Sequence, residues 1–172
     1  MLVVLLMNPK ITTEAVAERL LSDVMSWDLC DHLCKNLFLK MECRDTFITE
    51  WMQEPQLYKK RAAFVLIAAS VIHDKKLEND RMDGYLELIM RYADDEREHV
   101  KKATSSALKE IGKKDFHYNE KALLLAHEWT ERGNKAQRWI GKDALRELET
   151  MIKAEGRGRL ITSNTRMGKE TY

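Results

Sequence analysis

The segment around Trp27 and Asp31 carries the residue types best suited to chemistry in this chain. These two residues are four positions apart, so on a helix an indole and a carboxylate would project from one face. The face of an aromatic ring attracts positive charge, and a carboxylate beside it stabilises the same charge directly. The pair is therefore suited to a cationic ligand. A second interpretation stays open, in which Asp28 caps the helix, Trp27 fills core and Asp31 is solvated.

Apolar residues at spacings of three and four predict helices along nearly the whole chain. The predicted ranges are 13–25, 27–39, 43–54, 57–73, 80–92, 95–112, 119–132 and 135–155. Only seven Gly and two Pro occur among 172 residues, which favours short turns over long linkers. We expect one domain over residues 1–156 and a basic, flexible tail without a helical stripe over 157–172.

Three of the predicted helices share a pattern in which cations come first and small residues precede a leucine. The segments are Lys60–Leu66, Lys101–Leu108 and Gln137–Leu145. Recurrence about every 40 residues, with a helix pair in each unit, is typical of HEAT-like repeats. The sequence therefore predicts an all-α, HEAT-like solenoid of stacked antiparallel helix pairs that form a superhelix.

The apolar start of the chain, residues 1–7, is too short to span a membrane and lacks the basic region of a signal peptide. Three cysteines in helical segments are typical of reduced thiols. We therefore expect a cytoplasmic protein without a membrane partner. Because a terminal repeat normally exposes polar residues, the apolar start predicts either a truncated chain or a homo-oligomer interface.

Charge is nearly balanced, with 29 basic and 28 acidic residues, so only a segregated basic face could attract nucleic acid. Cations do recur at similar places in successive repeats, and stacking is expected to gather several of them on one surface. They are Lys59, Lys60, Arg61, Lys101, Lys102, Lys109, Lys113, Lys114, Arg138 and Lys142.

Four segments, taken in order, resemble the HEAT-like DNA alkylation repair glycosylases of the AlkD family. They are Ser26–Asp31, Lys60–Ala68, Asp95–Ala103 and Arg138–Leu148. The resemblance spans most of residues 1–150, although the family's opening helices would precede residue 1. It implies an enzyme that holds duplex DNA in a basic cleft and does not flip the base into a pocket. The reaction would be hydrolysis of the N-glycosidic bond of cationic N3- or N7-alkylated purines.

The resemblance also implies roles for particular residues. Asp31 matches the catalytic carboxylate, Trp27 an aromatic residue that contacts the backbone at the lesion, and Arg61 a phosphate-binding cation. Further DNA-binding roles are predicted for Lys60, Lys101, Lys102, Arg138 and Lys142. An alkylated purine is already a good leaving group, so such a protein mainly has to stabilise the oxocarbenium-like sugar and guide a water.

Ser106 departs from the family pattern, because a second catalytic tryptophan is expected at its position. A serine offers no indole face, so we expect weaker engagement of the lesion. Trp129 or Trp139 could substitute only from another helix, and Trp139 lies in a core-like stripe. Two alternatives therefore stay open: a non-catalytic protein that holds DNA, and a protein-interaction scaffold of the kind that many helical solenoids form.

Side chains of metal-ligating type cluster in one segment: Cys30, His32, Cys34 and Cys43. No close CxxC pair is present, and Cys30 and Cys34 lie one helical turn apart, so buried thiols are the favoured interpretation. Glu96 and His99 match half of a di-metal motif without a second copy. We expect neither a metal nor another cofactor.

Overall fold

The computed structural model describes residues 7–171 as an all-α protein with a small two-stranded sheet near its C-terminus. The helices before that sheet are α2 (Glu14–Ser22), α3 (Trp27–Asn36), the 3-10 helix η1 (Phe38–Lys40), α4 (Arg44–Trp51), α5 (Leu57–His73), α6 (Asn79–Tyr92), α7 (Glu98–Gly112), α8 (Phe116–Arg132) and α9 (Lys135–Leu148). They are followed by β1 (Met151–Ile152), β2 (Ile161–Thr162) and α10 (Arg166–Glu170). The expectations for the apolar start fall, except at Met7, outside the described residues.

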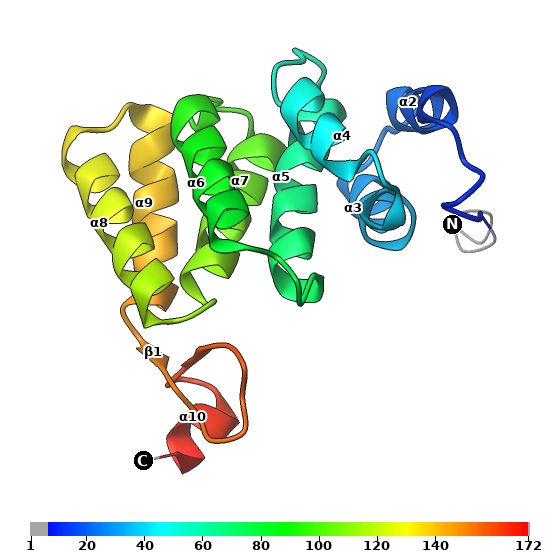
Figure 1. The fold of residues 1–172 in the computed structure, drawn as a ribbon. Coiled ribbons are helices and arrows are strands. Elements are labelled where there is room, and N and C mark those ends of the chain that lie inside the picture. Colours follow the sequence, from blue (N-terminus) through cyan, green and yellow to red (C-terminus); the bar gives the residue numbers. More distant parts are fainter. Residues whose placement is uncertain (1–6, 172) are drawn as a thin grey trace.

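The helices follow one another along a stack that begins with α2 and reaches α8 and α9 at the far end (Figure 1). Helices α3, α5, α7 and α9 form a row in which each packs against the next. Helix α4 packs on α5, α6 on α5 and α7, and α8 on α7 and α9. The prediction of an all-α solenoid is confirmed, and the three helices of the repeated pattern, α5, α7 and α9, are neighbours in the row. None of the helices within residues 7–171 is both long and apolar enough to cross a bilayer.

Helix α5 is the centre of the core, because its residues from Arg61 to Val71 are all buried. A helix that is apolar on every side is stable only when neighbours cover it, and here α3, α4 and α7 do so. At the other end of the stack, α8 and α9 approach so closely that a Cβ on Gly141 would lie 2.5 Å from the carbonyl oxygen of Ala126. This contact requires a glycine.

Local capping explains where several helices begin. Thr13 accepts a hydrogen bond from the Val16 amide, and Asn134 forms a capping box with Gln137. Helices α2 and α9 accordingly begin at Glu14 and Lys135, within one residue of the predicted starts at 13 and 135. Helix α8 differs from the prediction because it begins at Phe116, three residues before the predicted start at 119, where Asp115 caps it. Asn119, where the predicted helix began, is buried inside α8 and donates to the carbonyl of Leu148.

The C-terminal segment differs from the expected tail. Helix α9 ends at Leu148, and residues 151–162 form a small antiparallel hairpin, which we call the C-terminal hairpin. Arg159 donates to the carbonyls of Val71 and Glu110 at 2.8 and 2.7 Å, in the last turns of α5 and α7. Such carbonyls lack donors within their helix, and a cation is favourable there. Helical periodicity cannot reveal an anchor to residues so far away along the chain.

We expect Arg159→Met to open the C-terminal hairpin without unfolding the helical stack. The substitution removes charged hydrogen bonds to Val71 and Glu110, and a net loss of about 2 kcal/mol corresponds to roughly 30-fold faster amide exchange in the hairpin. Hydrogen exchange at Ile152 and Ile161 measures this. The matched control is Arg157→Met, an exposed arginine of the same hairpin whose side chain makes no hydrogen bond or ion pair within residues 7–171. Equal exchange in both variants would contradict the anchoring role.

Candidate nucleic-acid interface

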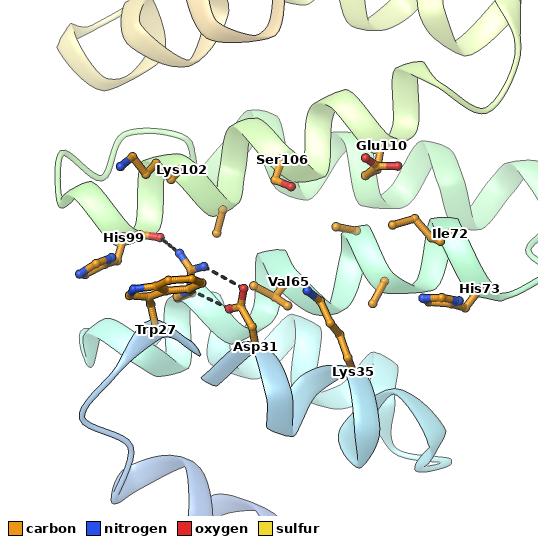
Figure 2. Close-up of a pocket in the computed structure, with 14 residues that line it drawn as sticks. Trp27, Asp31, Lys35, Val65, Ile72, His73, His99, Lys102, Ser106 and Glu110 are labelled. Atoms are coloured by element: carbon orange, nitrogen blue, oxygen red, sulfur yellow. Dashed lines mark hydrogen bonds and ion pairs between the residues drawn. The ribbon is translucent and has the colours of Figure 1, made fainter. Parts of the chain in front are cut away.

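A cavity of about 480 Å³ opens between α3, α5 and α7, and we call it the central cavity (Figure 2). Its apolar lining comes from Val65, Ala68, Ala69, Ile72 and Ala103. Its polar lining comes from Trp27, Asp31, Lys35, Arg61, His73, His99, Lys102, Ser106 and Glu110. The structure therefore brings four of the predicted site residues, together with Ser106, to one place.

Buried residues on the opposite side of α3 aim Trp27, Asp31 and Lys35 at the central cavity. Cys30 and Cys34 are fully buried, and their thiols donate to the Tyr58 and Ala62 carbonyls of α5 at 3.4 and 3.8 Å. Burial raises the pKa of the Cys34 thiol. The interpretation as buried thiols is confirmed for these two residues. Within residues 7–171 no three acidic, His or Cys side chains are grouped closely enough to hold a metal ion.

Arg61 and Asp31 form a bidentate ion pair on the wall of the central cavity. The Arg61 Nε and Nη2 atoms lie 2.9 and 3.0 Å from the two carboxylate oxygens, and Nη1 donates to the carbonyl of His99 at 2.6 Å. The Arg61 side chain is only 9% exposed. Asp31 is thus held by a partner rather than merely solvated, contrary to the second interpretation of the sequence.

Trp27 covers this ion pair and stays accessible. Its ring centre lies 5.7 Å from the Arg61 guanidinium carbon, and Figure 2 shows the indole beside the pair. Trp27 is 52% exposed, so it does not fill core as the second interpretation held. One indole face is occupied by a cation of the protein, and the exposed part can meet a ligand.

The geometry leaves Asp31 with unused hydrogen-bonding capacity. Each carboxylate oxygen can accept about two hydrogen bonds, and each accepts one from Arg61. The bidentate pair fixes the plane of the carboxylate, so its remaining lone pairs need no reorientation to meet a water or a developing positive charge. Arg61 is thus engaged with Asp31 and with the His99 carbonyl, while the phosphate contact that the resemblance implied for it stays a prediction.

We expect Arg61→Gln to lower the free energy of unfolding by about 2 kcal/mol, because it leaves the Asp31 carboxylate partly buried without its charged partner. Denaturant unfolding measures the loss. Lys102→Gln is the control, since this exposed cation of the same cavity forms only a surface pair with Glu98 and should cost less than about 0.5 kcal/mol. Equal small losses would show that the pair does not stabilise the fold.

A second basic surface lies where α7 and α9 begin, and we call it the Trp139 surface. It is a hollow of about 430 Å³ lined by Lys101, Lys135, Arg138, Trp139 and Lys142. The Lys101 ammonium lies 4.9 Å from the Trp139 ring centre. Three of the predicted DNA-binding cations are therefore neighbours here, while Lys102 faces the central cavity. Neither Trp129 nor Trp139 lines the central cavity, so neither takes the place of the missing tryptophan.

Lys60 lies apart from the two surfaces that gather the other predicted DNA-binding cations. Its side chain is 15% exposed, and its ammonium lies 3.5 Å from an Asp95 oxygen and 5.8 Å from the Tyr92 ring centre. It lines neither the central cavity nor the Trp139 surface. The repeat pattern placed Lys60 correctly at a helix start but could not show that the following helix pair supplies a carboxylate to it.

Sequence reasoning missed several lining residues. Lys35 lies four positions after Asp31, so the same helical spacing that paired Trp27 with Asp31 could have found it. His73 and Glu110 join the cavity only because α5 and α7 lie side by side, and no local signal marks them.

The fold and the site together define a helical-repeat protein with a carboxylate and an indole at a cavity flanked by basic surface. A family model described as DNA alkylation repair enzyme matches residues 1–148. The chain belongs to this family, which confirms the resemblance seen in the sequence. Its function is accordingly the repair of alkylated DNA, with DNA as its partner. Neither the curated proteins nor the solved structures contain a match to the chain.

Proposed function

We propose that this protein hydrolyses the N-glycosidic bond of N3- or N7-alkylated purines in duplex DNA. The observation that carries the proposal is the bidentate Asp31–Arg61 pair beside the half-exposed Trp27, on the wall of a cavity that also presents Lys102. An ionised carboxylate with a fixed orientation is suited to the positive charge that develops on the sugar as the bond breaks.

In the proposed reaction, the bonding pair of the N-glycosidic bond moves to the purine, which leaves as a neutral alkylated base. The sugar becomes oxocarbenium-like, and Asp31 stabilises this charge through its unused lone pairs. A water adds to the sugar carbon and loses its proton to solvent, which balances the charge of the cationic substrate. Trp27 contributes cation-π or CH-π contact to the lesion strand, and Arg61 keeps Asp31 in position.

Cations, all of them exposed except the partly buried Lys101, which pairs with Glu98, would hold the DNA backbone on both sides of the lesion. Lys102 and Lys35 line the central cavity, and Lys101, Arg138 and Lys142 lie on the Trp139 surface. Lysine and arginine on a shared surface neutralise phosphates, and the affinity then falls steeply with salt. A flat salt response would contradict DNA binding and favour a protein-interaction scaffold.

A second candidate function follows from Ser106, which is exposed on the wall of the central cavity at the position of the expected tryptophan. With one aromatic residue in place of two, the protein would hold alkylated DNA without cleaving the base. Binding would then persist without turnover.

The deciding experiment measures free 7-methylguanine released from duplex DNA that carries N7-methylguanine. Release above the spontaneous rate, from the modified duplex alone, is the result expected of a glycosylase. Salt-dependent binding without any release would support the second candidate and overturn the first.

A further inference from the structure

A third cavity, of about 540 Å³, lies between the ends of α5 and α7 and the C-terminal hairpin. We call it the hairpin cavity. Ile72, on α5, lines both this cavity and the central cavity, so the two are adjacent along the same helix. The hairpin lies beyond residues 1–148, the part of the chain that the family model matches.

Cations dominate the lining of the hairpin cavity. Lys75 and Arg157 are exposed and Lys114 is half-buried, and within residues 7–171 none of the three forms an ion pair. The only carboxylate among the lining residues, Asp74, is already 3.1 Å from an Arg44 nitrogen. The cavity therefore presents three cations that no carboxylate of the described chain neutralises.

The hairpin is held firmly enough to keep these cations together. Arg159 bridges the ends of α5 and α7, and the Leu160 amide donates to the Lys113 carbonyl at 2.9 Å, next to Lys114. Leu160 is itself buried. Arg159 uses its charge in this anchor and against Glu110, so it does not count among the available cations.

The hairpin cavity and the Trp139 surface lie at opposite ends of α7. This helix has 15 residues, which corresponds to about 22 Å along its axis. Successive phosphates of one DNA strand are about 3.4 Å apart along the duplex, so roughly six or seven base pairs cover this distance. A short stretch of duplex can reach both basic surfaces while it passes over the central cavity.

We propose that Lys75, Lys114 and Arg157 bind backbone phosphates of duplex DNA, as a second grip opposite the Trp139 surface. This inference rests on the proposed function. It adds a DNA contact that the hairpin, outside the matched residues 1–148, completes by bringing Arg157 to Lys75 and Lys114. The two grips hold the duplex on both sides of the Trp27–Asp31 wall, and the anchored hairpin fixes one of them at the ends of α5 and α7.

The test is binding of an undamaged short duplex, measured by fluorescence anisotropy over a range of salt concentrations. The test variant carries Lys75→Gln, Lys114→Gln and Arg157→Gln. A matched control carries Lys10→Gln, Lys40→Gln and Arg91→Gln, the same change of charge at exposed positions outside the central cavity, the hairpin cavity and the Trp139 surface.

For the test variant we expect about tenfold weaker binding or more, and a slope of log affinity against log salt that is smaller by about two to three. Each single substitution should lower the slope by about one. The control should match the unmodified protein. A test variant with the slope of the control overturns the second grip and leaves the proposed function standing. If the unmodified protein shows no salt-dependent binding, the proposed function fails, and the grip with it.

Discussion

Asp31→Asn is expected to reduce release of 7-methylguanine at least about 100-fold, the size of effect seen when one preorganised electrostatic group is removed from an active site. Asparagine keeps the size of the side chain and one oxygen that can accept from Arg61. It removes the negative charge that would face the sugar cation. The expected loss is therefore in the chemical step, and single-turnover release under saturating protein measures it.

The control for this variant is Asp28→Asn, one turn earlier on the same helix. Asp28 is exposed and lies outside the central cavity, so its substitution should leave release unchanged. Binding of the modified duplex by Asp31→Asn should also stay close to that of the unmodified protein, because the phosphate-binding cations are intact. Release that survives in Asp31→Asn would remove Asp31 from the mechanism.

Ser106→Trp is expected to increase release by about 5- to 30-fold, since a cation-π contact with a partly desolvated cation contributes about 1 to 2 kcal/mol. Ser106 is exposed on α7, across the central cavity from Asp31, so an indole at this position points into open space rather than into the core (Figure 2). Together with Trp27 it would enclose the lesion strand between two aromatic residues.

Ser106→Leu separates the aromatic effect from simple bulk, because leucine adds apolar volume without a ring. An equal gain in both variants would show that packing, and not the indole face, was missing. If base is released only after Ser106→Trp, the protein found in nature holds alkylated DNA without cleaving it. If Ser106→Trp changes nothing, the serine is not a deficit of this site.

The helical stack could be predicted from the sequence because apolar spacing and the repeat pattern are local signals. Helix α5 begins and ends at Leu57 and His73, as its apolar periodicity predicted. The repeat pattern also predicted that α5, α7 and α9 are equivalent. The C-terminal hairpin could not be predicted in this way, because Arg159 finds its partners on α5 and α7 and not within its own segment.

The candidate site, like the fold, could be predicted only where its signals are local in the sequence. Helical spacing placed Trp27 and Asp31 on one face, and the structure has both on the cavity wall. The partner of Asp31 is 30 residues away, so no local pattern could show that Arg61 turns inward to it. Lys60, which precedes Arg61 in the sequence, likewise pairs with a carboxylate far along the chain, that of Asp95. Whether a surface cation is available depends on the carboxylates that the fold brings to it.

The Asp31–Arg61 pair also bears on which ligands can stay in the central cavity. Two opposite charges at hydrogen-bonding distance produce a field that decays quickly, so a small cation diffusing in solution gains little by entering. A cationic alkylated base within a DNA strand is instead brought to the central cavity by the strand itself. Under the proposed function, such a wall would favour an alkylated base carried by a DNA strand over a free metal ion or polyamine, and a neutral base, once detached from its strand, would have no charge by which to be retained.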